Sequence, residues 1–503
     1  MIPTSRRRAL SRAGHRALGG LVAAWLLAGS GCTTIPWGNG GLADEIPADA
    51  RDPHGIVRVL GAEDLNAAAA RLTNLVPTQW ENGLAVGGMV TLDANDTLLD
   101  ADIDGVVVEP GPIQIALGGA GLEVRLGVSI APVHFETYDT TTATCAPTLS
   151  AEGGVLVLDL GLVTDKLGRV QPVLVGAPRL EGEDLVVDWS GCLDGAPAPL
   201  LDSLTDALWD ALADVTADAI APELLAGLPP ALGLDLATGL SGTVAADAIG
   251  AGYARFSVMA DTDDAVAVWQ RVGDAIVVPF GVGISAEQHP CMPALALPAM
   301  GTSPLPGPGS AEPKTALISA AVVRQAIIAG WFAGAACGSH ATSGVEIPAE
   351  MLAAAWPALA RLPAETALSV QLWPRESPSV ALAIGGADQL TVGTGLVDVD
   401  LFAELDGALV RLASMTVDAD AVLGVRIDAT GWVTLAPEDV TLRASGTRAG
   451  LLSAPPLDAA EAVLVPIVQS LLSGRPLLVV PARSGTTGTT RAKVTAEHVA
   501  IPM

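Results

Sequence analysis

The chain runs twice through the same order of predicted elements: a helix, a long region of strands, and a further helix. The four helices are predicted over 62–76, 201–225, 315–336 and 457–472. Strand-like segments fill 83–187 in the first half and 368–442 in the second. Corresponding helices start 253 and 256 residues apart, although few residues are identical between the halves. This agreement predicts a structural duplication, with one folded unit in each half.

Two different periodicities separate helices from strands. Between 201 and 225 leucines occupy one face, and an aspartate recurs at every fourth position on another, at Asp202, Asp206, Asp210, Asp214 and Asp218. This pattern predicts an amphipathic helix whose acidic stripe faces solvent. In 99–104 and 398–401, apolar and acidic residues alternate instead. Alternation indicates strands with one buried face and one wet face.

Composition narrows the class of protein further. A length of 503 residues favours two folded units over one. Half of the residues are hydrophobic, yet no run of about 20 apolar residues follows the N-terminal segment, so a transmembrane helix is not expected. The formal charge is −29, and Lys166, Lys314 and Lys493 are the only lysines. Nucleic acid is excluded as a partner, because it requires clustered lysine and arginine.

The N-terminal segment has the pattern of a secretion signal. A basic stretch with five arginines precedes the apolar segment 21–27, and Cys32 follows the small residues 28–31. This order predicts an export signal, and its end resembles the lipobox of bacterial lipoproteins, with Gly29 where the family usually has a larger apolar residue. Cleavage before Cys32 would remove five of the 26 basic residues, leaving 472 residues and a formal charge of −34. The alternative is an ordinary signal peptide followed by an incidental cysteine.

The lipobox resemblance implies a lipid anchor on Cys32 and a place in the outer membrane, since Thr33 rather than aspartate follows the cysteine. The protein would then face either the periplasm or the cell surface. The predicted organisation is a signal peptide over 1–31, a tether over 32–58, a first β-rich unit over 59–240, central strands with a Pro-rich joint over 241–313, and a second β-rich unit over 314–503.

Four further cysteines suit an exported protein. Cys145, Cys192, Cys291 and Cys337 form an even set, which indicates disulfides in an oxidising compartment. Three pairings are possible. Pairing between sequence neighbours, Cys145 with Cys192 and Cys291 with Cys337, would place one disulfide in each half.

The order of elements resembles the tubular lipid-binding superfamily, in its two-barrel branch with bactericidal/permeability-increasing protein and lipopolysaccharide-binding protein. Cys145 and Cys192 occupy places similar to the single disulfide of that family. The segment 318–335 resembles the helix that opens the second barrel, and 463–483 resembles the family's C-terminal order of helix, glycine and strand. The resemblance implies an α+β fold: two tandem curved antiparallel β-barrels, each wrapped around a long α-helix, in an elongated pseudo-symmetric arrangement.

The resemblance also implies a non-enzymatic function, namely that apolar grooves in the barrels bind phospholipid or fatty acyl chains. Burying each methylene contributes about 0.8 kcal/mol, so an acyl chain needs no polar motif. The candidate lining in the first half comprises Leu65, Leu72, Leu75, Leu204, Leu208 and Leu212. The candidate lining in the second half comprises Ile318, Val322, Ile327, Trp331, Leu464, Val468 and Leu471. For each of these residues, plain core packing is the alternative.

Two departures from the family qualify this reading. Members that bind endotoxin use a Lys/Arg-rich tip, whereas this chain is acidic and has three lysines. Cys291 and Cys337 have no counterpart in the family pattern.

No catalytic or metal-binding motif stands out. The sequence has no Gly-x-Ser-x-Gly, His-Glu-x-x-His or nucleotide-binding loop, and its six histidines are scattered, so neither cofactor nor metal is expected. Two other functions remain open beside lipid binding or transfer. One is a β-rich surface module for adhesion or scaffolding, and the other is an exported hydrolase.

Overall fold

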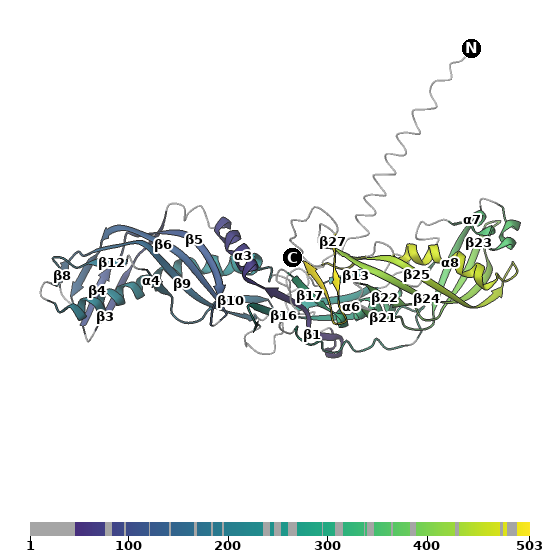
Figure 1. Cartoon of the computed structure of the whole chain (residues 1–503), viewed down its shortest axis with the longest axis horizontal. Coiled ribbons are helices and arrows are strands. Elements are labelled where there is room, and N and C mark those ends of the chain that lie inside the picture. Colours follow the sequence, from purple (N-terminus) through teal and green to yellow (C-terminus); the bar gives the residue numbers. More distant parts are fainter. Residues whose placement is uncertain are drawn as a thin grey trace, which may run out of the picture.

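The computed structural model describes residues 46–502, except for 76–82, 95–96, 120, 140–141, 165–168, 183–184, 194–195, 235–241, 246–252, 260–268, 294, 307–314, 336–337, 340–346, 364–365, 383–388, 428–431, 473–475 and 480–489. The signal segment, Cys32 and most of the expected tether therefore lie outside the described residues. The described part is elongated, with one curled unit at each end and a sheet between them (Figure 1).

The first unit is a curled antiparallel sheet with a smaller sheet at its far end (Figure 1). The larger sheet contains β2 (Leu84–Val86), β5 (Val106–Leu117), β6 (Leu122–His134), β9 (Thr148–Thr164), β10 (Val170–Leu174), β11 (Arg179–Glu181) and β12 (Leu185–Asp188). The smaller contains β3 (Met89–Ala94), β4 (Thr97–Asp102), β7 (Glu136–Asp139) and β8 (Thr142–Cys145). Every second residue of β6 from Leu122 to Ile130 is buried, so one face of the larger sheet points inward.

Two helices fill the inner side of this unit. They are α3 (Ala62–Leu75) and α4 (Ala198–Leu232), and they pack against each other. Helix α4 is longer than the sequence predicts, because it continues through Pro222, Pro229 and Pro230. It ends at Gly233, whose φ of 68° is left-handed and favours glycine. The acidic stripe from Asp202 to Asp218 is exposed, as predicted.

The second unit is a ten-stranded antiparallel sheet. Its strands are β18 (Gly338–Ser339), β19 (Ile347–Pro348), β20 (Ala367–Pro374), β21 (Ser379–Leu382), β22 (Leu390–Gly393), β23 (Val397–Leu405), β24 (Ala408–Ile427), β25 (Trp432–Ala449), β26 (Pro476–Val479) and β27 (Thr490–Arg491). Helix α8 (Leu457–Leu472) packs on β25, and α7 (Ala349–Ala353) and η5 (Pro357–Arg361) contact each other. In the described part of the chain, no helix combines the length and apolar content of a transmembrane helix.

A central sheet joins the two units. Its strand order is β13 (Gly242–Ala245), β14 (Tyr253–Met259), β16 (Ala275–Ala286), β1 (Arg51–Leu60), β17 (Thr315–Ser319), β29 (His498–Pro502) and β28 (Lys493–Val494), with β15 (Gln270–Val272) beside β16. A short η1 (Ala48–Ala50) precedes β1. Helix α6 (Ala320–Gly330) and the π-helical turn η3 (Trp331–Ala335) follow β17. The predicted α+β class with two curled antiparallel sheets is confirmed.

Two predicted segments are corrected by the structure. Residues 51–60, expected within or just after the tether, form β1, because the run from Ile56 to Leu60 is fully buried between two strands. Residues 315–319, expected to be helical, form β17 and are buried at every position. A segment that is buried on all sides has no periodicity to distinguish helix from strand. With these corrections, each half begins with a strand that is followed by a helix. The first helices, α3 and α6, start at residues 62 and 320, which are 258 apart. The later helices, α4 and α8, start at residues 198 and 457, which are 259 apart.

The carboxylate of Asp52 holds the middle of the central sheet. This residue has no exposed surface. One oxygen accepts hydrogen bonds from the backbone N–H groups of His54 at 3.0 Å and Ser303 at 3.1 Å. The other accepts from the Ser319 hydroxyl at 2.7 Å, and the Ser319 oxygen in turn accepts from the N–H of Val322 and caps α6. Asp52 therefore connects β1, the 303 loop and the start of α6.

A buried ion pair connects β1 to α3. Arg58 Nη2 donates to Asp64 Oδ1 at 2.8 Å, and Arg58 Nη1 donates to the carbonyl of Thr315 on β17 at 3.1 Å. The second Asp64 oxygen accepts from the N–H of Gly61 at the helix start, at 3.0 Å. Burial lowers the pKa of Arg58, and the carboxylate of Asp64 opposes that effect. Removing either charge would leave the other buried, which is costly.

Replacing Asp52 tests its connecting role. Asp52→Asn keeps the side-chain volume but replaces one acceptor oxygen with a donor, so at least one buried donor loses its partner. We expect the free energy of unfolding to fall by about 1–3 kcal/mol. Denaturant unfolding followed by circular dichroism measures this change. Asp49→Asn, at an exposed position nearby, is the matched control and should unfold like the parent. Equal stability of the Asp52 variant and the parent would contradict this role.

We expect His498 to make the stability of the central sheet depend on pH. It pairs with Ser319 in the strand register and is 6% exposed, and burial lowers its pKa from 6.5, opposed by Glu497 and Asp52. Below pH 6.5 the unfolded chain binds a proton at this residue before the folded chain does, so stability should fall as pH drops. The free energy of unfolding of His498→Gln should fall less than that of the parent between about pH 7 and 5, the range in which histidine titrates. The control His134→Gln, at an exposed position, should show the same fall as the parent. A fall in His498→Gln as large as that of the parent would refute the role of His498.

Candidate functional site

The predicted lining residues of the first half share one apolar core between the curled sheet and its two helices. They are Leu65, Leu72, Leu204, Leu208 and Leu212, each at most 4% exposed. The side chain of Leu75 lies outside the described residues. Because these leucines are covered by protein atoms, an acyl chain would reach them only if neighbouring side chains moved. In this state of the molecule they pack as core.

Helices α3 and α4 approach each other closely at Gly227. A Cβ atom at this position would lie 3.0 Å from Leu72 Cδ2, closer than nearly all real contacts, so glycine permits the approach. Arg71 Nη1 also donates a hydrogen bond of 2.8 Å to the carbonyl of Ala231. The two helices therefore meet along the C-terminal part of α4.

Helix α4 also carries an apolar edge that is only partly buried. Leu201, Ala211 and Val215 pack against the core but keep some exposed surface. These three side chains lie at the boundary between the apolar interior and solvent.

Two polar groups on the buried face of α4 have no partner among the described residues. They are the indole Nε1–H of Trp209 and the hydroxyl of Thr216. The two residues are 6% and 1% exposed. A separation of seven residues is close to two helical turns, so both lie on the same side of α4, about 10 Å apart along its axis. Leaving such a group unsatisfied costs about 1–3 kcal/mol.

Two other polar side chains of the same unit have hydrogen-bond partners. The indole of Trp189 donates to Thr205 Oγ1 of α4 at 3.0 Å. On α3, the Thr73 hydroxyl donates to the carbonyl of Ala69 one turn earlier, at 2.9 Å. The indole Nε1–H of Trp269, which packs against the same core, also lacks a partner among the described residues. Trp209 and Thr216 each offer a donor to a water molecule or a ligand oxygen. No sequence motif marks this pair, and the available signal is the seven-residue spacing on a leucine- and alanine-rich helix face.

The candidate residues of the second half are distributed over three clusters. Ile318 and Val322 belong to the same core as α3 and α4, with Ile318 on β17 rather than on a helix, and Ile327 packs against that core partly buried. Trp331 lies in a small separate cluster, and Leu464 lies in the core under α7, η5 and α8. The side chains of Val468 and Leu471 lie outside the described residues. The described members of this set therefore belong to three separate apolar clusters.

The second half repeats the unpartnered indole groups. The Nε1–H groups of Trp331 and Trp356 are buried without a hydrogen-bond partner in the described part of the chain. Trp356 is 2% exposed and belongs to the same core as Leu464. Each half thus has at least one buried donor inside an apolar cluster.

The cysteines near these interiors are oxidised. The sulfurs of Cys192 and Cys291 each take part in a disulfide. Cys192 lies shortly before α4, where its N–H donates to the carbonyl of Trp189. The side chains of Cys145 and Cys337 lie outside the described residues, so the pairing remains a prediction. Within the ranges that the structure describes, no three His, Cys, Asp or Glu side chains gather into a metal-binding group.

Comparisons with known proteins give structural likeness only. No protein-family model matches the chain, and no curated protein matches it. Among solved structures, the crystal structure of lipopolysaccharide binding protein is similar at 16% identity, with a TM-score of 0.39, over 89% of this chain and 99% of that one. P47 of Clostridium botulinum E1 is similar at 10% identity, with a TM-score of 0.28, over 90% of this chain and 99% of that one.

Proposed function

We propose that the protein is an exported, lipid-anchored lipid-binding or lipid-transfer protein that holds acyl chains inside its curled units. The supporting observation is the pair of unpartnered donors, Trp209 Nε1–H and Thr216 Oγ1–H, in the apolar interior beside α4. Ligand sites commonly consist of an apolar lining with a few placed polar groups, and this interior has that composition.

The energetics favour an acyl ligand with an oxygen at one end. Each buried methylene contributes about 0.8 kcal/mol, so a long chain supplies most of the binding energy. An ester or carboxylate oxygen can accept from Trp209 or Thr216, which relieves the cost of a buried donor. The acyl chain would enter along the partly exposed edge formed by Leu201, Ala211 and Val215, because these side chains lie between solvent and the core.

The charge of the protein bears on which headgroups it accepts. The exposed acidic stripe of α4 adjoins the proposed entrance and makes the local potential negative there. Negative potential repels anionic headgroups and favours neutral or zwitterionic lipids. We therefore propose a phospholipid without net charge, or a fatty acid entering in its protonated form, as the ligand class.

Localisation is part of the same proposal. Cleavage before Cys32 would leave a lipid-modified N-terminus, and the segment between Cys32 and η1 would hold the folded part near the outer membrane. The Cys145–Cys192 and Cys291–Cys337 disulfides are proposed on the sequence order.

Thr216→Val tests the lipid site. Valine has nearly the shape of threonine without the hydroxyl, so lipid affinity should fall about tenfold while the lipid-free protein gains up to about 1–3 kcal/mol in unfolding free energy. Affinity is measured by displacement of a fluorescent fatty acid from delipidated protein, and mass spectrometry under native conditions reports lipid that copurifies.

The matched control is Thr205→Val, on the same helix. It removes the partner of the Trp189 indole, so it should destabilise the protein and leave lipid affinity unchanged. Absence of copurified lipid together with no uptake by the parent protein would refute lipid binding and favour a surface interaction or scaffold role.

Cys32→Ser tests the anchor. The parent protein, expressed in a Gram-negative host, should fractionate with membranes and give an N-terminal peptide carrying a diacylglyceryl group on the Cys32 sulfur. The variant should lose the modification and leave the membrane fraction. Gly29→Leu, which restores the usual residue of the lipobox, should keep or increase the modified fraction. An unmodified parent peptide would contradict the anchor but not lipid binding.

A further inference from the structure

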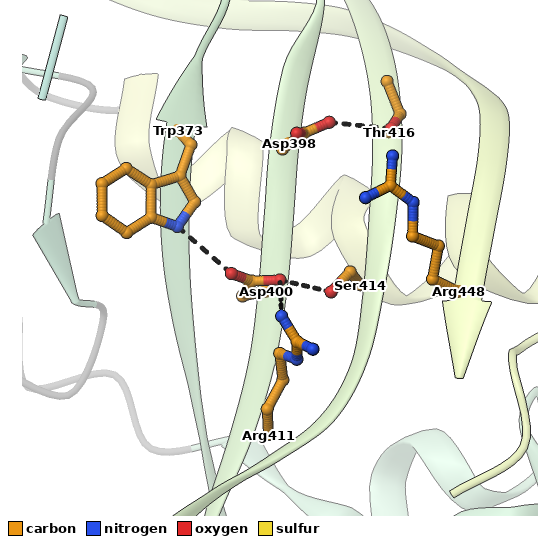
Figure 2. A pocket seen from close by; sticks show the side chains of 7 residues that line it. All are labelled: Trp373, Asp398, Asp400, Arg411, Ser414, Thr416 and Arg448. Atoms are coloured by element: carbon orange, nitrogen blue, oxygen red, sulfur yellow. Dashed lines mark hydrogen bonds and ion pairs between the residues drawn. The ribbon is translucent and has the colours of Figure 1, made fainter. Parts of the chain in front are cut away.

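The outer face of the second unit carries a polar hollow. Strands β20, β23, β24 and β25 lie side by side, and the hollow is lined by Trp373, Asp398, Asp400, Arg411, Ser414, Thr416 and Arg448 (Figure 2). Strand alternation separates it from the core, because Val399, Leu401 and Met415 between these positions are buried on the opposite face. The hollow is therefore distinct from the apolar interiors.

Strand register brings its residues together. Trp373 pairs with Asp398, Asp398 with Thr416, and Asp400 with Ser414. Ser414 pairs in turn with Arg448 on β25. A row of polar side chains thus crosses four strands. Thr416 faces Gly446, which adds no side chain to the row and leaves that end open.

Internal hydrogen bonds fix the two carboxylates and the indole. Asp400 accepts from Trp373 Nε1 at 3.2 Å and from the Ser414 hydroxyl. Asp398 accepts from the Thr416 hydroxyl at 2.7 Å and from the Arg375 guanidinium. The side chains of both aspartates are less than one-fifth exposed. The polar groups are thereby held in place before any ligand arrives.

Two guanidinium groups remain available over this row. Arg411 lies 3.9 Å from Asp400, a loose contact, with its side chain 54% exposed. The guanidinium of Arg448 has no ion pair or hydrogen bond among the described residues, although it lines the hollow. Figure 2 shows both guanidinium groups extending toward the aspartates. An arginine fork matches a carboxylate with two parallel hydrogen bonds, so this pair is suited to an anion.

Trp373 adds a surface for a flat partner. It is 40% exposed, while its N–H is already bonded to Asp400. The face of an aromatic ring carries negative partial charge and attracts polarised C–H bonds, such as those on one face of a sugar ring. The hollow has a volume of about 160 Å³. Pockets for drug-sized ligands occupy about 300–1,000 Å³, so this one suits a single ring.

We propose that this hollow binds a carboxylated saccharide, with one uronic acid ring stacked on Trp373 and its carboxylate held by Arg448 and Arg411. The ring hydroxyls would donate to Asp398 and Asp400 and exchange hydrogen bonds with Ser414 and Thr416. A small inorganic anion would contact the arginines but would make no stacking contact with Trp373. Because the hollow is open on the protein surface, further sugar rings can extend from the bound one, and a polysaccharide fits as well as a monomer.

Calorimetric titration of the full chain tests this site. The probes are an oligomer of uronic acid (alginate hexamer), a neutral oligomer of glucose (maltohexaose) and inorganic phosphate. The alginate hexamer should bind at least tenfold more tightly than either of the others. Arg448→Gln should reduce alginate affinity at least tenfold and remove the preference over maltohexaose. Trp373→Ala should weaken binding of both oligomers. Thermal unfolding checks that these exposed substitutions leave the fold intact.

Arg443→Gln is the matched control, since Arg443 is an exposed arginine of the same strand β25 outside the hollow. It should leave alginate affinity within about twofold, the precision expected for a change of a few tenths of a kcal/mol. Equal binding of phosphate and alginate would overturn the proposal in favour of simple ion binding. If Arg443→Gln loses as much alginate affinity as Arg448→Gln, the binding depends on overall charge, and the proposed specific site is refuted. Arg448-dependent binding to vesicles containing phosphatidylinositol 4-phosphate, without alginate binding, would instead identify a membrane contact.

Discussion

Strand β1 forms backbone hydrogen bonds along both of its edges, to β16 on one side and to β17 on the other. This double pairing is the physical constraint on which the arrangement of the two units depends. The buried carboxylate of Asp52 strengthens it, because three donors from separate segments converge on one charge. The ion pair between Arg58 and Asp64 then fixes the direction in which α3 leaves the sheet. Each unit is consequently anchored at one end to the same sheet and extends away from it (Figure 1).

Alternation along the strands gives each unit two different surfaces. On β23, Val399 and Leu401 enter the core while Asp398 and Asp400 face outward. One short segment therefore contributes to the apolar interior and also to the polar hollow. Successive side chains of a strand point to opposite faces. A shift of the strand pairing by one residue would therefore turn the apolar side chains outward and the polar ones inward. The apolar core of the second unit and the proposed saccharide site thus lie on opposite faces of the same strands.

Sequence patterns predict the parts of the fold that have a clear period. Helix α8 spans Leu457–Leu472, as predicted, and the acidic stripe of α4 is exposed as its four-residue spacing indicates. Residues 315–319 were missed as a strand because they are buried at every position. The hollow depends on register between segments far apart in the chain, such as Trp373 beside Asp398, which no local pattern encodes. A buried donor without a partner, such as the indole of Trp209, can be identified only from the positions of all the atoms around it.

The position of β1 has a consequence for the order in which the molecule assembles. Its partner strands begin at Ala275 and Thr315, more than 200 residues later in the chain. Loop closure over such a distance is slow, and an unpaired strand is prone to join the wrong edge. During synthesis from the N-terminus, all residues of the first unit are made before β1 can pair with both of its partner strands. The segment from Arg51 to Leu60 can therefore take its final place between two strands only after Thr315–Ser319 has been synthesised.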